Sequence, residues 1–179
     1  GVPIWQVMIS QEAEETGRGE EAILLEMGEN YRVMKEAVGR GIQGVTTHSG
    51  MGGGDARRLH DYLQAGNILT DETLLKAAGY AIATNEVNAA MGRICATPTA
   101  GSAGVLPGVL LAMQEKMALP DETIVRHIFT AGAMGLVIAN RAGISGAEGG
   151  CQAEIGSASA MAAAAVTELM GGTPHQAAH

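Results

Sequence analysis

Three short glycine-rich segments carry the side chains that could do chemistry. They span residues 48–55, 97–104 and 145–151, and each mixes glycine with hydroxyl, imidazole or thiol groups. Glycine allows backbone N–H groups to approach a ligand closely, and successive N–H groups can bind an anion such as a carboxylate. None of the segments has the Lys that follows the glycines of a nucleotide-binding P-loop. Together the three segments favour a site for a small anionic ligand over three unrelated turns.

His48 and Cys151 are the candidates for a reactive role. His48 stands among glycines in a predicted loop, and an imidazole can donate or accept a proton near neutral pH. Cys151 follows two glycines at a predicted helix start, where the positive end of the helix dipole favours the thiolate that binds metal. A small buried hydrophobic role is the alternative for Cys151, and it is favoured for Cys95. Neither cysteine belongs to a zinc-binding spacing.

Composition limits both the fold and the partners. The chain has 179 residues, 46% of them hydrophobic, which is enough for a buried core. The net charge of −8 disfavours binding to nucleic acid, because an acidic surface repels phosphates. Two cysteines are too few for a disulfide scaffold. Aromatic residues make up only 3%, while there are 26 glycines and 10 methionines, so closely packed helices are favoured over a β-sandwich.

The hydrophobic spacing predicts an all-α fold, a compact helical domain with glycine-rich active-site loops at 39–54, 96–104 and 142–150. No stretch alternates as a strand would. The predicted helices cover residues 4–16, 20–38, 55–64, about 71–91, 105–117, a segment from Pro120 that contains 128–139, and 151–170.

A last helix is predicted at Thr173, where Thr173 and Gln176 form a capping box around a proline. A helix of only about five residues is not stable by itself and needs more sequence to propagate. We therefore expect the chain to be incomplete at its C-terminus.

The N-terminal sequence and the longest apolar run predict where the protein is located. The N-terminus has no basic and then apolar secretory pattern, which predicts a cytoplasmic protein. The longest apolar run, 128–139, is shorter than the roughly 20 residues of a spanning helix, so we expect no membrane association.

Two long motifs, residues 85–108 and 145–161, resemble the signatures of the iron–sulfur-dependent L-serine dehydratase alpha chain. The similarity runs from the N-terminus to His179. It implies one catalytic domain over residues 1–179, part of an enzyme that converts L-serine to pyruvate and ammonia. It also implies a [4Fe–4S] cluster and no pyridoxal phosphate. Cys151 matches the first cluster-ligand position. The resemblance further implies that an open iron acts as a Lewis acid on the serine hydroxyl while a base removes the α-proton. His48 is the candidate for this base.

The loop chemistry assigns substrate contacts to seven residues with small hydroxyl groups or accessible backbone. These would hold the serine carboxylate and ammonium groups: Ser49, Gly53, Gly54, Thr99, Gly101, Ser102 and Ser145. Gly52 stands where the family usually has Thr, which removes one expected contact.

The cysteine count limits what these residues can do alone. Two cysteines cannot supply the three thiolates that the cluster requires, so the chain by itself is expected to be inactive and free of the cluster. The resemblance also implies a beta-type subunit or domain as a partner, and an oligomer.

Two alternatives remain open. One is a non-catalytic helical assembly module that uses the Ala- and Gly-rich stretches 128–139 and 157–170 as a subunit interface. The other is a related cluster-dependent lyase acting on another amino acid or on a hydroxy acid. Because one methyl group changes binding by only about 1–3 kcal/mol, the loops do not decide between serine and threonine.

Overall fold

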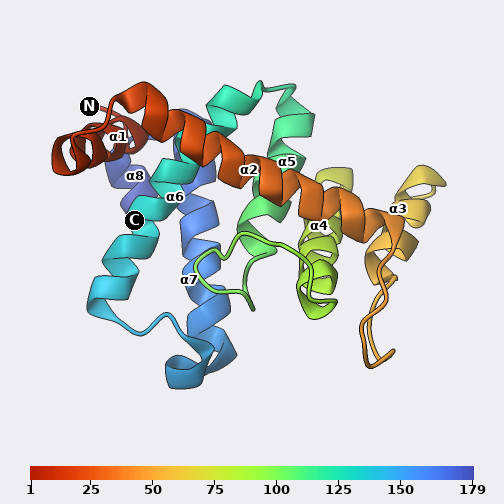
Figure 1. The fold of residues 1–179 in the computed structure, drawn as a ribbon. Helices are drawn as coiled ribbons and strands as arrows, with labels where there is room; N and C mark the ends of the chain where they lie inside the picture. Colours follow the sequence, from red (N-terminus) through yellow and green to blue (C-terminus); the bar gives the residue numbers. More distant parts are fainter. The chain divides into compact units, whose positions relative to one another are not determined.

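The structure, a computed structural model that describes all 179 residues, consists of α-helices and contains no strand (Figure 1). The helices are α1 Ile4–Thr16, α2 Glu20–Gln43, α3 Asp55–Gln64, α4 Glu72–Ala89, α5 Val105–Met117, α6 Asp121–Arg141, α7 Gly146–Leu169 and α8 Pro174–Ala178. The predicted all-α fold is confirmed.

The helices pack into two compact units. The terminal unit comprises Gly1–Tyr31 and Leu119–His179, and the central unit comprises Arg32–Ala118. Helices α1, α6, α7 and α8 belong to the terminal unit, α3, α4 and α5 belong to the central unit, and α2 begins in one and ends in the other. The expected single catalytic domain over residues 1–179 stays a prediction.

Local capping sets several helix boundaries where the sequence predicts them. The side chain of Asp71 accepts a hydrogen bond of 2.9 Å from the backbone N–H of Leu74 at the start of α4. This hydrogen bond is the main reason that the pKa of Asp71 lies below its ordinary value. At α8, Thr173 and Gln176 form the predicted reciprocal capping box. These boundaries need only near neighbours in sequence, which is why they were predictable.

Small residues let the helices of the central unit approach closely. A Cβ atom placed on Gly41 of α2 would lie 2.4 Å from the carbonyl oxygen of Ala83 on α4. One placed on Gly104, which precedes α5, would lie 2.3 Å from the carbonyl oxygen of Ala81. Neither distance is compatible with a side chain. The low aromatic content therefore corresponds to close backbone packing.

In the terminal unit, α7 presents a small-residue face. Ala158, Ala162 and Ala165 lie at helical spacing and are all buried. Helix α6 packs against α7 and also against α1. Its buried residues include Ile124, Ile128 and Ala131, so most of its apolar side chains serve the core.

Two predicted loop boundaries were wrong. Residues 39–43 are helical and form the last turn of α2, although Gly39 and Gly41 disfavour helix. Close packing of Gly41 against α4 offsets that preference. Residues 146–149 are also helical, because α7 begins at Gly146. Gly150 nevertheless has φ 72° and ψ −177°, so the helix is broken there and resumes at the predicted start, Cys151.

Helix α6 is long and apolar enough to cross a membrane, but half of its most apolar window is buried inside the protein. The buried set includes the polar side chains His127 and Thr130. Length and composition alone do not distinguish a buried core helix from a membrane-spanning one. The expected absence of membrane association therefore stays a prediction.

Candidate functional site

The first glycine-rich loop, residues 44–54, is closed by hydrogen bonds of Thr47. The hydroxyl of Thr47 donates to the carbonyl of Gly52 over 2.9 Å and accepts from the Gly52 N–H over 3.2 Å. The backbone N–H of Thr47 donates to the same carbonyl over 3.2 Å. The hydroxyl of Ser49 lies 3.3 Å from that of Thr47, and His48 is exposed between them. The loop is thus a small ring that presents His48 and Ser49 outward.

The exit from this loop requires glycine. Gly53 has φ 115°, and a Cβ on it would lie 2.1 Å from the carbonyl oxygen of Val45. Gly54 follows with φ 89° and precedes α3, where it offers no side chain to cap the helix. The missing cap comes from another helix: Oε1 of Glu86 accepts from the backbone N–H of Asp55 over 2.6 Å. Glu86 on α4 therefore fixes the point where the loop enters α3.

The second loop, residues 97–104, folds around the buried hydroxyl of Ser102. This hydroxyl lies 3.0 Å from that of Thr99 and donates to the carbonyl of Thr97 over 3.3 Å. The peptide bond between Thr97 and Pro98 is cis. Nδ2 of Asn88 donates to the carbonyl of Ala100 over 3.0 Å and connects the loop to α4. Ser102 is fully buried and bonds within its own loop, whereas Gly101 is exposed at its tip.

The last two turns of α4 thus bring two of the three predicted segments together within the central unit. Glu86 bonds to the exit of the first loop, and Asn88, two residues later, bonds to the second. Six of the seven predicted substrate-binding residues lie in these two loops: Ser49, Gly53, Gly54, Thr99, Gly101 and Ser102, of which Ser102 is buried. Their contact with a substrate stays a prediction.

The third segment lies in the terminal unit, at the start of α7. The hydroxyl of Ser145 accepts from the backbone N–H of Ala147 over 3.1 Å and caps the helix. Cys151 is exposed and is the first residue after the break at Gly150. Its thiol is therefore accessible at a helix start, where the helix dipole favours the thiolate that binds metal.

The two thiols have different surroundings. Cys95 is partly buried, and this burial raises the pKa of its thiol, which disfavours the thiolate. Cys151 is exposed. No group of three or more His, Cys, Asp or Glu side chains in the 179 residues is placed to hold a metal ion. These residues therefore offer one candidate cluster ligand and not a complete cluster site.

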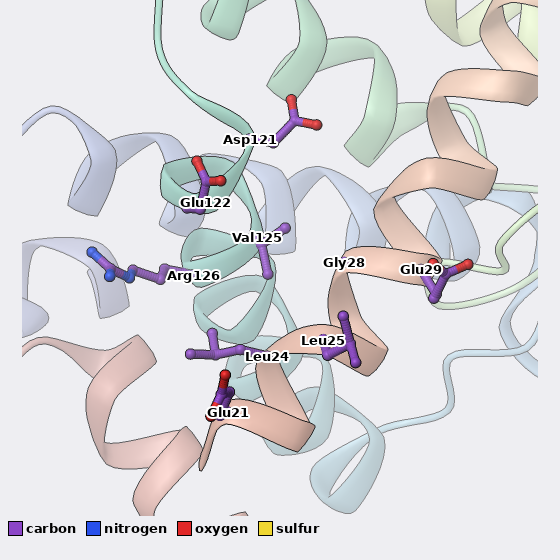
Figure 2. A pocket seen from close by; sticks show the side chains of 9 residues that line it. All are labelled: Glu21, Leu24, Leu25, Gly28, Glu29, Asp121, Glu122, Val125 and Arg126. Carbon is purple, nitrogen blue, oxygen red and sulfur yellow. The ribbon is translucent and has the colours of Figure 1, made fainter.

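One cavity has no lining residue in any of the three segments. It measures about 370 Å³ and lies in the terminal unit, between the first turns of α2 and of α6 (Figure 2). Its lining is acidic and apolar, with one cation: Glu21, Leu24, Leu25, Gly28, Glu29, Asp121, Glu122, Val125 and Arg126. Four carboxylates against one guanidinium disfavour a ligand that carries a carboxylate. The cavity is therefore unsuited to the anionic ligand expected for the three segments.

Three residues that build the site were not predicted to have a role in it. Thr47 closes the first loop, and Glu86 and Asn88 hold the two loops to α4. The one signal in the sequence was that polar residues interrupt the apolar surface of the predicted helix at 85, 86 and 88. Such a helix carries buried polar groups that must have partners.

Comparison with known proteins finds the same family along the whole chain. A sequence model of the family described as serine dehydratase alpha chain matches residues 1–179. A relative from Bacillus subtilis (strain 168), named probable L-serine dehydratase, alpha chain, is 56% identical over 98% of this chain and 58% of its own length. The L-serine dehydratase alpha chain of Peptoniphilus asaccharolyticus is 41% identical over 100% of this chain and 62% of its own.

A relative from Streptomyces coelicolor, named L-serine dehydratase, is 38% identical over 98% of this chain and only 39% of its own length. The 179 residues thus span less than two thirds of the length of each of these three relatives. The resemblance found in the two motifs is confirmed.

Proposed function

Because the chain belongs to the serine dehydratase alpha chain family, we propose that it is the alpha part of an enzyme that converts L-serine to pyruvate and ammonia. The observation that carries the proposal is the unbroken family match over residues 1–179, which takes in both loops of the central unit and Cys151. The activity is proposed for the complete protein, of which these residues are a part. By themselves we expect them to be inactive.

The reaction removes one water molecule from serine and later consumes one. A base takes the α-proton, and the β-hydroxyl leaves as water, which gives an enamine. The enamine becomes an imine, and water hydrolyses it to pyruvate and ammonia. Hydroxide is a poor leaving group, so the reaction needs an acid or a Lewis acid at that oxygen.

The chain's own loops are suited to hold the substrate. Backbone N–H groups and the hydroxyls of Ser49 and Thr99 are neutral donors for the substrate carboxylate. His48 is exposed on the first loop, where it could exchange a proton with a bound substrate. We propose that His48 is the base that removes the α-proton. The variant His48→Gln, which cannot take up this proton, tests the proposal.

A [4Fe–4S] cluster without pyridoxal phosphate is the proposed cofactor, with Cys151 as one of its ligands. The remaining ligands would come from the part of the protein beyond these residues. We further propose a beta-type partner, since the relatives are named alpha chains, together with an oligomeric, cytoplasmic enzyme that binds neither nucleic acid nor membranes.

The proposal is tested by assaying the complete protein with its companion part under anaerobic conditions. We expect pyruvate from L-serine, at a rate that hydroxylamine does not reduce, because hydroxylamine blocks carbonyl cofactors such as pyridoxal phosphate. L-Threonine, which would give 2-oxobutyrate, is the matched alternative substrate. Iron-loaded protein that releases no pyruvate, or a hydroxylamine-sensitive activity, would contradict the proposal.

A further inference from the structure

One buried carboxylate oxygen in the central unit has no hydrogen-bond partner. It is Oε2 of Glu86, a residue whose exposed fraction is only 8%. Buried polar atoms are satisfied in the great majority of protein structures, and a carboxylate oxygen needs a partner more than a neutral group does. An unpartnered oxygen of this kind is therefore a place where a donor from outside these residues would bind.

The other oxygen of Glu86 fixes the orientation of the carboxylate. Oε1 accepts from the backbone N–H of Asp55 over 2.6 Å, directly after Gly53 and Gly54. This bond holds the carboxylate at the exit of the first loop. Asn88, on the same end of α4, holds the second loop through Ala100. The free oxygen thus belongs to the helix end that carries both predicted substrate loops.

Three cations of the central unit are bound to other partners. Arg58 forms an ion pair with Asp55 over 2.5 Å, and Arg57 donates to the carbonyl of Gln43. Lys76, on the same helix as Glu86, pairs with Glu72 and Glu115 at 3.1 Å each. The charge of Glu86 is therefore not neutralised by these side chains, and a cationic donor is the partner with the greatest gain.

We propose that Oε2 of Glu86 accepts a hydrogen bond from the α-ammonium group of the substrate. The inference rests on the proposed function and deepens it, because it names the substrate class as amino acids and excludes hydroxy acids of the same shape. An amino acid carries two charges: the neutral donors of the loops suit its carboxylate, and Glu86 supplies an acidic acceptor at the exit of the first loop. A hydroxy acid would leave the carboxylate of Glu86 unpaired.

The variant Glu86→Gln separates the proposed contact of Oε2 with the substrate from the hydrogen bond of Oε1 that caps α3. Glutamine keeps one carbonyl oxygen that can accept from Asp55, but it replaces the acceptor for the ammonium group with an NH₂ donor. Glu72→Gln is the matched control, because it removes the same charge from an exposed position on the same helix. Thermal melting of both variants checks that α3 and the loop remain folded.

The measurement compares two ligands that differ only in the amine, L-alanine and propionate, by calorimetry on the complete protein. Neither can be dehydrated. In Glu86→Gln we expect the affinity for L-alanine to fall at least about tenfold, as on losing one charge-assisted hydrogen bond, while propionate binding stays unchanged. KM for L-serine should rise in parallel. The control Glu72→Gln should change neither affinity.

An equal loss for both ligands would overturn the inference, because it would mean that Glu86 only positions the loops. So would wild-type protein that binds L-alanine no more tightly than propionate. If the wild type prefers L-alanine and Glu86→Gln abolishes that preference while no pyruvate forms from serine, the inference stands and the proposed function fails. The two claims are therefore separable.

Discussion

Gly53 shows how strictly the first loop depends on one residue. A Cβ at this position would meet the carbonyl oxygen of Val45 at 2.1 Å, and the φ of 115° is unfavourable for any side chain. We expect Gly53→Ala to lower the free energy of unfolding by about 1–3 kcal/mol. Gly52→Ala is the control, since its Cβ would lie 3.7 Å from the side chain of Thr47 and its φ is not positive.

Urea unfolding of both variants, compared with the wild type, measures this difference. Equal stability of Gly53→Ala and Gly52→Ala would show that the loop relaxes away from the described geometry.

At this scale the sequence identified reactive residues better than supporting ones. His48 and Cys151 stand out because an imidazole or thiol among glycines is unusual, and both are exposed in the structure. In the sequence, Glu86 and Asn88 show only as polar interruptions of an apolar helix surface. Their roles depend on hydrogen bonds to residues 31 and 12 positions away, which no local pattern encodes.

Between elements, a buried carboxylate joins three helices of the terminal unit. Glu168 on α7 accepts from the backbone N–H of Ile4, at the start of α1, over 2.5 Å, and from the hydroxyl of Thr130 on α6. Thr130→Val removes one donor and leaves a buried oxygen unpaired, so we expect a loss of about 1–3 kcal/mol in the free energy of unfolding.

A double-mutant cycle tests this connection. Combined with Glu168→Gln, the change Thr130→Val should cost much less than it does alone, because the two side chains share one bond. The cycle is measured by denaturant unfolding. Strict additivity of the two single changes would contradict the described contact.

In the central unit, α4 and α5 are joined by groups that respond to alkaline pH. Tyr80 donates to Glu115 over 2.6 Å, and burial together with this bond raises the pKa of Tyr80. Hydrogen bonds to Glu72 and Glu115 raise the pKa of Lys76. Both groups therefore prefer their protonated forms in the folded state. Their stabilising contribution is complete below the ordinary values of 10.0 and 10.5 and is lost as the pH rises through the raised values.

Glu115→Gln should therefore lower stability at neutral pH and flatten its decline above pH 10. Melting temperatures of the wild type and Glu115→Gln across this range provide the measurement. If the two curves stay parallel up to the alkaline limit, the contact between Tyr80 and Glu115 does not contribute as described.

The boundaries of the helices were predictable where they depend on residues close in sequence, and not where they depend on tertiary packing. The starts at Asp71 and Thr173 were predicted because the capping groups lie within three residues. Residues 39–43 were predicted as loop, since glycine disfavours helix, but packing of Gly41 against α4 decided otherwise. The first turn of α7 was missed because glycines at 146, 149 and 150 obscure it.

For the whole molecule, the composition predicted the all-α fold class but not the division of the chain into two compact units. Few aromatic residues and many small ones indicated close helix packing, which the structure shows. The two compact units share helix α2, and no change in composition marks the boundary within that helix. The 179 residues cover 58% and 62% of the length of two alpha-chain relatives, and the proposed cluster needs more thiolate ligands than their two cysteines can supply.

The most direct test of the central claim compares Cys151→Ser with Cys95→Ser in the complete, anaerobically prepared protein. Iron content, the visible absorbance of the cluster and pyruvate release from L-serine are measured for both, with melting curves as a check of folding. Our account predicts that Cys151→Ser loses cluster and activity while Cys95→Ser, at a partly buried thiol, keeps both. A folded Cys151→Ser variant with full iron content, cluster absorbance and activity would contradict it.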